Sequence, residues 1–157
     1  MAASTPALAA LHRAGVEFKT HRYELVESDL SYGEAVAAAL GVDPGRLFKT
    51  LVAECDAKPV VAIVPVRSQL SLKALARAAT GKKAQMADPV DAEKWTGYVV
   101  GGISPFAQKR RLPAFLDDSA VGFETIYVSA GLRGLQVELD PTDLITLLDC
   151  RLAALAD

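Results

Sequence analysis

Short helices with marked ends restrict most strongly how this chain can fold. The segment TPALAALHRAG places Thr5 at the N-cap, Pro6 at the first helical position and Gly15 just past the end. Four more segments carry a capping serine or aspartate or an apolar helical face: SYGEAVAAALG, SLKALARAATG, DPVDAEKW and DPTDLITLLDCRLAAL. The sequence therefore predicts five helices.

Short β-like runs lie between these helices and do not alternate with them regularly. They are VEFKTHRY, LFKTLVAEC, PVVAIVPV, GYVVGG, PAFLDD, ETIYVSAG and GLQVEL. The stretch YVSAGLRGLQVEL predicts a hairpin that turns through Gly131 to Gly134, so antiparallel pairing is extensive. We expect an α+β fold, with a mixed, largely antiparallel sheet or partly closed barrel and about five surrounding helices.

The length and composition fit one globular domain spanning residues 1–157, because 51% of the 157 residues are hydrophobic and 23% are charged. The first residues, MAASTPALAALHRAG, lack a basic start and a sustained apolar run, and no later stretch is long enough to cross a membrane. We therefore expect a cytoplasmic protein with no membrane partner. Cys55 and Cys150 then represent reduced thiols.

Several kinds of chemistry lack the residues they need. The two histidines, His12 and His21, have no ligand spacing, and there is no phosphate-binding loop, so neither a metal nor a cofactor is expected. GGISPF is not a nucleophile elbow, and Ser104 has no evident base. His21 is more typical of a surface or capping residue than of a general base. Cys150 lies among leucines of a predicted helix, which favours a buried thiol.

Nucleic-acid binding is restricted by charge and by aromatic content. A net charge of −2 and a single tryptophan argue against a polycationic DNA binder and against a module that reads RNA sequence. Two local basic runs remain, Lys82 and Lys83 after a glycine, and Lys109, Arg110 and Arg111 after GGISPFAQ. Such runs are usually solvated, but here they also fit a phosphate-binding rim around a glycine-lined pocket.

Two features remain as candidate machinery. Lys49 shares its strand face with apolar Leu47 and Leu51, so its ammonium either extends to solvent or points into a cavity. The GGISP segment either forms a bulge or uses Gly101 and Gly102 to bring backbone N–H groups close to an oxyanion, with Pro105 stiffening the exit.

The chain resembles the YbaK-type Cys-tRNA(Pro) deacylases, which are relatives of the prolyl-tRNA synthetase editing domain. The resemblance runs through YGEAVAAALGVDPGRLFKTLV, VAIVPVRSQLSLKALARA, KKAQMADP, TGYVVGGISPFAQKRRLP and IYVSAGLRGLQVEL, in that order. It implies an enzyme that acts in trans on the ester between a wrong amino acid and tRNA. It also implies that the enzyme supplies no covalent nucleophile, since the cysteinyl thiol attacks its own ester carbonyl. The protein then needs to orient the substrate and stabilise the oxyanion.

The resemblance also assigns roles to residues. Lys49 takes the place of the family's pocket lysine, and Gly101, Gly102 and Ile103 form the catalytic loop. The implied substrate-binding residues are Tyr23, Tyr32, Thr50, Ser104, Pro105, Ser129 and Gln136. The two basic runs, with their charge, are expected to bind tRNA. From the residues alone, the tyrosines also fit ordinary half-buried packing, and Ser129 fits a turn hydroxyl that caps the hairpin.

Gln136 departs from the family pattern, in which an aspartate often follows RGL. The loss of that charge leaves open a preference for alanine or serine in place of cysteine. A non-catalytic module that binds aminoacyl-tRNA or a synthetase is a further alternative. Prolyl-tRNA synthetase is the partner that the resemblance suggests.

Overall fold

The computed structural model describes residues 4–157, which form five α-helices, one 3₁₀ helix and eight strands. The five predicted helices are all present. Residues 1–3 lie outside the described residues. They begin the N-terminal segment that, by its sequence, does not resemble a signal peptide. The helices are α1 (Pro6–Ala14), α2 (Tyr32–Leu40), α3 (Leu72–Ala78), α4 (Pro89–Thr96), α5 (Pro141–Leu148) and the 3₁₀ helix η1 (Asp118–Gly122). The strands are β1 (Phe18–Arg22), β2 (Phe48–Cys55), β3 (Lys58–Pro65), β4 (Ala84–Met86), β5 (Ala114–Asp117), β6 (Ile126–Leu132), β7 (Leu135–Leu139) and β8 (Arg151–Ala153).

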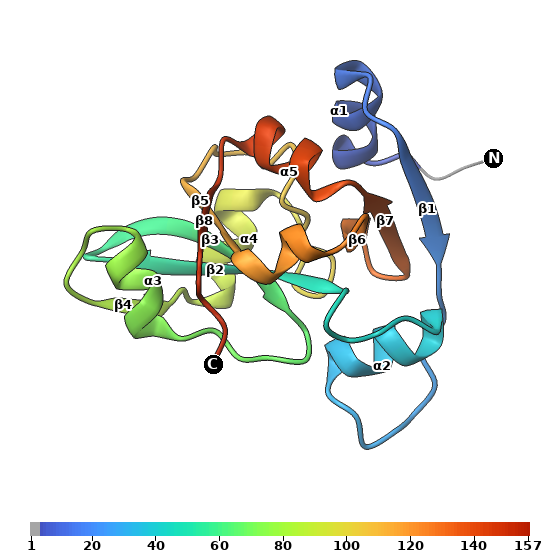
Figure 1. The fold of residues 1–157 in the computed structure, drawn as a ribbon, viewed down its shortest axis with the longest axis horizontal. Coiled ribbons are helices and arrows are strands. Elements are labelled where there is room, and N and C mark those ends of the chain that lie inside the picture. The colour runs from blue at the N-terminus through green and yellow to red at the C-terminus, as the bar shows by residue number, and fades with distance from the viewer. Residues whose placement is uncertain (1–3) are drawn as a thin grey trace.

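The strands form two sheets (Figure 1). The smaller sheet has the order β1-β7-β6 and is antiparallel, and the larger has the order β4-β2-β3-β5-β8. In the larger sheet β2 pairs antiparallel with β3 and β4, whereas β5 pairs parallel with β3 and β8. A single-residue bridge between Leu47 and Tyr127 joins the two sheets. The predicted α+β fold with mixed, largely antiparallel pairing is confirmed, and the described strands do not close into a barrel.

Local capping explains why the helix predictions succeed. The Thr5 hydroxyl accepts a hydrogen bond from the N–H of Leu8 at 3.1 Å and donates to the carbonyl of Ala130 at 2.5 Å, so the cap also fixes α1 to β6. Gly15 ends α1 with a φ of 70°, a left-handed conformation that glycine adopts without strain. These signals lie within a few residues of each helix end, and a sequence therefore displays them directly.

Two predictions of secondary structure were wrong, one of a strand and one of the end of a helix. GYVVGG is not a strand, because Gly97 caps α4, the Val100 N–H donates to the Glu93 carboxylate at 2.7 Å and the Gly102 N–H donates to the Val99 carbonyl at 2.8 Å. The last helix ends at Leu148 instead of running through the terminal leucines, and Leu152 lies in β8. Cys150 is buried as predicted, but after the helix. Strand β4 was not predicted.

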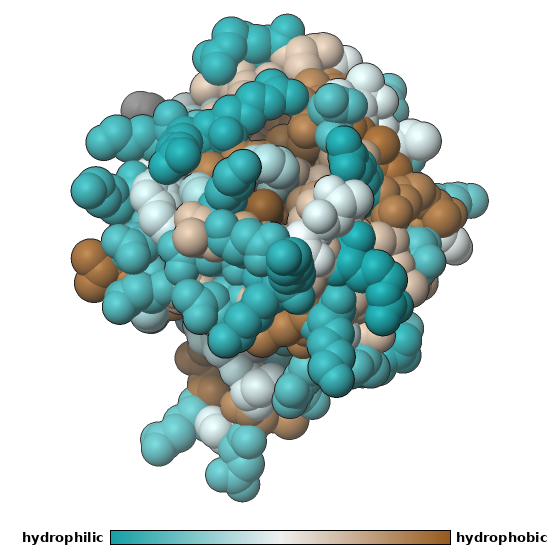
Figure 2. Space-filling model, turned by 90° about the vertical axis from the view of Figure 1, so that its left-hand side faces the viewer, coloured by the Kyte–Doolittle hydropathy of each residue, from teal (hydrophilic) through white to brown (hydrophobic). Residues whose placement is uncertain are grey.

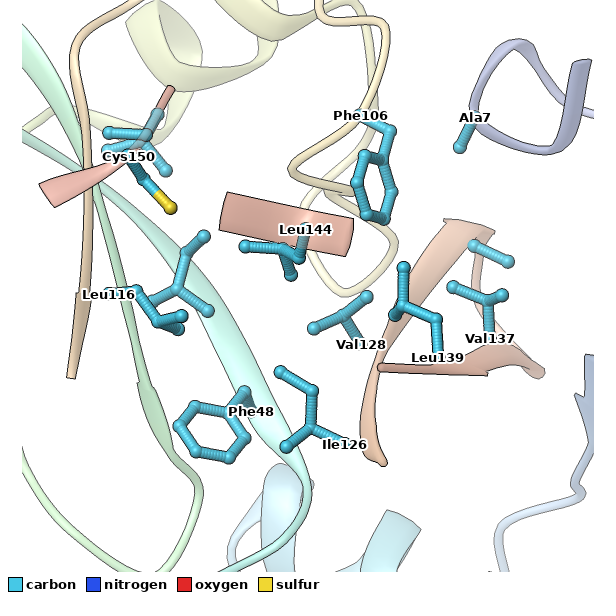
Figure 3. Close-up of a cluster of buried hydrophobic side chains, with 14 of the residues drawn as sticks. Ala7, Phe48, Phe106, Leu116, Ile126, Val128, Val137, Leu139, Leu144 and Cys150 are labelled. Atoms are coloured by element: carbon cyan, nitrogen blue, oxygen red, sulfur yellow. The ribbon is translucent and has the colours of Figure 1, made fainter. Parts of the chain in front are cut away.

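The main core lies between the two sheets and is closed by α5. Figure 3 shows Phe48, Leu116, Ile126, Val128, Leu139 and Leu144 pointing toward one another from β2, β5, β6, β7 and α5. A separate buried cluster packs α2 against the hairpin and the strand ends, through Tyr23, Val36, Ala37, Leu47, Val66 and Tyr127. This second cluster positions the first turn of α2 beside the start of β2.

No helix among residues 4–157 combines the length and the hydropathy needed to cross a lipid bilayer.

Candidate functional site

A cavity of about 440 Å³ lies where α2, β2, the segment after α4 and the β6–β7 hairpin meet. Seven of the residues singled out in the sequence line it: Tyr32, Lys49, Thr50, Gly101, Ile103, Ser129 and Gln136. The rest of the wall is largely apolar and includes Phe48, Val52, Met86, Pro89 and Ala92. We call this cavity the pocket. The fold thus gathers side chains from positions 32 to 136 into one hollow.

Lys49 is the half-buried cation of the pocket wall. Burial lowers the pKa of its ammonium below the ordinary value, and the negative charge of Glu34 on α2 acts in the opposite direction. Lys49 is one of the residues that line the cavity. An ammonium held in such a wall interacts more strongly with a ligand than one in bulk water.

Two buried polar atoms of the pocket have no hydrogen-bond partner among residues 4–157. They are the Oγ1 atom of Thr50 and the Oε1 atom of Gln136, and both side chains line the pocket. Gln136 is only 6% exposed. Leaving a buried acceptor unpaired costs about 1–3 kcal/mol, so the pocket offers two acceptors that a ligand with N–H or O–H donors satisfies.

Tyr23 and Tyr32 have different places. The Tyr32 hydroxyl donates to the Gly101 carbonyl at 3.1 Å and lies 3.2 Å from the hydroxyl of Tyr23. Burial and this contact with Tyr23 raise the pKa of Tyr32 to about 12, so the phenol stays neutral. Tyr23 itself is buried behind Tyr32 and is not part of the pocket wall. The pair therefore ties α2 to the glycine loop.

The glycine loop contributes to the pocket through Gly101 and Ile103. Their backbone N–H groups have no acceptor among residues 4–157, whereas the N–H of Gly102 is bound to the Val99 carbonyl. A Cβ on Gly102 would lie 3.0 Å from the backbone nitrogen of Arg133, so this glycine allows the loop to pack against the hairpin. Gly101 and Ile103 thus remain as the free donors of the loop.

The other predicted loop and hairpin residues have structural contacts. Ser104 is fully buried, and its hydroxyl accepts from the Phe106 N–H at 3.2 Å. Pro105 lies against a separate cavity of about 190 Å³. The Ser129 hydroxyl accepts from the Gly131 N–H at 3.1 Å, as expected of a turn hydroxyl, and its side chain also lines the pocket.

The basic residues do not surround the pocket. The backbone N–H groups of Lys82 and Lys83 donate to the Asp56 carboxylate at the far end of β2, roughly 20 Å along the strand from Lys49 at about 3.3 Å per residue. There Arg111 lines a groove of about 660 Å³ that also holds Lys58 and Arg151. The face over α3, β4 and the β2–β3 turn is largely hydrophilic (Figure 2).

Lys109 and Arg110 follow α4 more closely. Their backbone N–H groups donate to the carbonyls of Thr96 and Trp95 at the end of that helix. Neither residue lines the pocket.

Two sets of polar residues near the pocket escaped the sequence interpretation. Arg133, in the β6–β7 turn, donates from Nε to the Val100 carbonyl at 3.0 Å, and its guanidinium lies 5.7 Å from the centre of the Tyr32 ring. An arginine in a turn of a functional hairpin was the available signal. The second set centres on Glu138, which accepts from His21 at 2.9 Å and from Arg46 at 3.1 Å. His21 is thus paired with a carboxylate outside the pocket.

Metal ligands are not clustered in the described part of the chain: residues 4–157 hold no group of three or more His, Cys, Asp or Glu placed to bind one ion.

Comparisons with known proteins agree with one another. The profile of the aminoacyl-tRNA editing domain family matches residues 28–147. The Enterococcus faecalis protein named "Putative Cys-tRNA(Pro)/Cys-tRNA(Cys) deacylase EbsC" is 40% identical over 144 residues, which are 91% of this chain and 87% of that protein. The Escherichia coli "Multifunctional Ser/Thr-tRNA deacylase ProXp-y" is 27% identical over 141 residues, 89% of this chain and 84% of that protein. Among solved structures, "a putative trans-editing enzyme for prolyl tRNA synthetase" superposes with a TM-score of 0.81 at 22% identity and 99% coverage of both chains, which is a likeness of fold.

Proposed function

The chain belongs to the aminoacyl-tRNA editing domain family, and from this premise we propose that it is a trans-acting deacylase whose main substrate is Cys-tRNA(Pro). One observation carries the choice of mechanism. The pocket is lined by a half-buried lysine, by two unpaired acceptors, and by Gly101 and Ile103, whose N–H groups have no acceptor among residues 4–157, but its wall contains neither a cysteine nor a histidine. A pocket of this kind binds and polarises an ester without attacking it.

In the proposed reaction the substrate supplies the nucleophile. The cysteinyl sulfur forms a bond to its own ester carbonyl carbon, the bond from that carbon to the ribose oxygen breaks, and the thiol proton passes to the departing tRNA hydroxyl. The cyclic thioester that results is hydrolysed by water. Alignment of the thiol and stabilisation of the oxyanion account for the rate, because an ester is already activated toward this attack.

The pocket residues divide the remaining tasks. The N–H groups of Gly101 and Ile103 donate to the developing oxyanion, and the Lys49 ammonium binds the ester or ribose oxygens. Thr50 and Gln136 accept hydrogen bonds from the substrate's ammonium, which carries three donors and satisfies both unpaired oxygens. Tyr32 holds the loop carbonyl of Gly101.

A second candidate substrate is a serine or threonine ester. It is favoured by Gln136, whose neutral amide accepts a hydroxyl as readily as an ammonium, and by the likeness to the Ser/Thr-tRNA deacylase of Escherichia coli. Without a thiol, a water molecule or the tRNA's own hydroxyl would have to attack. The third candidate is a module that binds charged tRNA without cleaving it. A measurement of deacylase activity distinguishes this candidate from the two enzymes.

The test compares Cys-, Ser- and Ala-charged tRNA(Pro) side by side at equal enzyme concentration. We expect Cys-tRNA(Pro) to be cleaved much faster than the other two, and Cys55→Ala and Cys150→Ala to retain this activity because both thiols lie outside the pocket. Faster cleavage of the serine ester would favour the second candidate. Tight binding of all three without cleavage would favour the binding module, and a trapped aminoacyl-enzyme would exclude the thiol mechanism.

Two further proposals concern the surroundings of the enzyme. We place it in the cytoplasm, where charged tRNA is used, and propose prolyl-tRNA synthetase as the partner that delivers tRNA(Pro). The partner proposal rests on the resemblance to the synthetase's editing domain. Co-purification of the two proteins in the presence of tRNA(Pro) tests it.

A further inference from the structure

Arg133 is held beside the pocket by contacts that fix its orientation. Its Nε donates to the Val100 carbonyl and its guanidinium lies over the ring of Tyr32. Tyr32 and Val100 both line the pocket and are 43% and 42% exposed, so they form part of its rim. Arginine side chains at a surface turn usually retain several rotamers, whereas this one is stacked and hydrogen-bonded.

Gly101 is shaped by the same arginine. A Cβ at this position would lie 2.4 Å from Nε and 2.9 Å from Cζ of Arg133, and the backbone φ of 92° is one that other residues rarely adopt. Gly101 thus lets the guanidinium lie directly against the loop. A loop and an arginine that interlock in this way keep the cation at one point of the rim.

The guanidinium still has donors to offer. Only Nε has an acceptor among residues 4–157, and no carboxylate there forms a salt bridge with Arg133. A planar guanidinium with free N–H groups suits a carboxylate or a phosphate, which it binds with two parallel hydrogen bonds. The Arg133 guanidinium has no such anionic partner among residues 4–157.

The substrate of the proposed function decides between a carboxylate and a phosphate as the group that Arg133 binds. The 3′ end of an aminoacyl-tRNA presents an ammonium, which the arginine repels, and neutral hydroxyls and bases. Its only anions are the phosphodiesters, since the amino acid's carboxyl group is bound as the ester. Lys49 lies inside the pocket, where the ester must be, so the two cations meet different parts of the ligand.

We propose that Arg133 binds the phosphodiester on the 5′ side of the substrate's terminal adenosine, and that Gly101 is required to hold it there. This inference rests on the proposed function and deepens it by separating a rim site for phosphate from the pocket for the ester. The site recognises the common end of all tRNAs, so it contributes affinity and register and leaves the choice of amino acid to the pocket.

The experiment compares two small substrates, the cysteinyl ester of the dinucleotide CpA, which has one phosphodiester, and the cysteinyl ester of adenosine, which has none. We expect Arg133→Gln to lower kcat/KM for the dinucleotide ester about 10- to 100-fold, mainly through KM, the usual effect of losing a hydrogen bond to a charged group. The adenosine ester should be cleaved at the wild-type rate. Arg133→Lys should restore part of the loss, and Arg13→Gln on α1 is the matched control.

An equal loss on both esters would overturn the proposal, because Arg133 would then act by supporting the loop. An unchanged rate on the dinucleotide ester would overturn it as well. Failure of the proposed function would look different: the wild-type protein would cleave neither ester nor Cys-tRNA(Pro). The phosphate site would then be judged from binding of uncharged CpA and of adenosine, where Arg133→Gln must weaken CpA alone.

Discussion

At the scale of single residues, the two cations near the pocket differ in their surroundings more than in their charge. Lys49 is half-buried in an apolar wall that lowers its pKa, whereas Arg133 is exposed and held by a carbonyl and an aromatic ring. A lysine whose pKa is reduced by burial can lose its proton within an accessible pH range, but a guanidinium cannot. The pH dependence of the enzyme should therefore report Lys49.

Lys49→Met should reduce deacylation about 10²- to 10³-fold, a loss typical of removing one group that stabilises an oxyanion. The methionine keeps most of the stem and removes a charge that burial disfavours, so the melting temperature should not fall. Initial rates and thermal denaturation check the two parts. A nearly normal rate would mean that the ammonium merely extends to solvent.

The same residue predicts a rate that rises and then falls with pH. The rate should rise as the substrate thiol ionises, near its ordinary pKa of about 8.5. It should fall when Lys49 loses its proton, which happens below the ordinary lysine value because burial has lowered its pKa. Measured rates, corrected for spontaneous ester hydrolysis, should show both limbs, and Lys49→Met should lose the alkaline decline. A decline that persists in this variant would assign it to another group.

Gly101→Ala should raise KM for the dinucleotide ester as much as Arg133→Gln does, since the new Cβ displaces Nε. It should also lower kcat, because the N–H of Gly101 is a proposed oxyanion donor. The effects of the two changes on KM should not be additive in a double-mutant cycle, because both remove the same interaction with the phosphodiester. The variant should also lose about 1–2 kcal/mol of stability, because a φ of 92° strains a residue with a side chain. Gly122→Ala, which meets open space at an unstrained position, is the control. Additive effects of the two changes on KM would show that Gly101 and Arg133 act through different interactions.

At the scale of elements, Asp117 connects the end of β5 with η1 and with the C-terminal segment. Its carboxylate is buried and accepts from the Leu155 N–H at 2.9 Å, the Ala156 N–H at 3.0 Å and the Ser119 hydroxyl at 2.5 Å. Burial raises the pKa of Asp117, but these hydrogen bonds outweigh it, and the net pKa is lowered. The folded state thus favours the ionised form.

Asp117→Asn should therefore lower the free energy of unfolding at pH 7 by about 1.5–3 kcal/mol. The stabilisation by Asp117 is present above the ordinary carboxyl pKa of 3.8 and is lost as the pH falls through the lower folded pKa, so the two proteins should converge in acid. Urea denaturation at several pH values measures this. The exposed neighbour Asp118, changed to Asn, should show no such difference. A constant gap between pH 7 and strong acid would exclude the carboxylate as its cause.

The elements also explain what the sequence predicted well and where it failed. Thr5 and Gly15 mark the ends of α1 through contacts between near neighbours, and such signals are visible without a fold. GYVVGG has the composition of a strand but no partner strand, and Glu93 and Val99 bind its N–H groups instead. Strands β4 and β8 have three residues each and exist only because β2 and β5 lie beside them.

At the scale of the whole molecule, the pocket was predictable only in part. Lys49 was conspicuous because a cation interrupts an apolar strand face, and the resemblance supplied Ser129 and Gln136. The only signal for Arg133 was its place in the hairpin turn, because its contacts reach Tyr32 and Val100 across the fold. The sequence analysis placed the basic runs on one rim around the pocket. The chain positions alone do not show that Lys49 lies at one end of β2 and Lys82 beside the other end.

Lys82 and Lys83 lie far from the pocket, so we expect them to contribute to tRNA binding independently of the pocket residues. Lys82→Gln combined with Lys83→Gln should weaken tRNA binding, and the slope of log K against log salt should flatten by about 0.9 for each phosphate that the variant no longer neutralises. Lys19→Gln on β1, in the other sheet, is the control. Titrations at several salt concentrations measure both quantities. An unaltered slope would show that the tRNA body does not reach this end of the protein.

The bridge between Leu47 and Tyr127 gives the pocket a mechanical role. Lys49 and Thr50 belong to one sheet and Ser129 and Gln136 to the other, so a bound ligand braces the joint between them. A non-cleavable amide analogue of cysteinyl-adenosine should slow deuterium uptake at the Tyr127 amide, which donates to the Arg46 carbonyl at 3.1 Å across this joint. The Val61 amide, bound within the larger sheet, should respond less. Slower deuterium uptake at the joint between the two sheets would thus report that a ligand occupies the pocket.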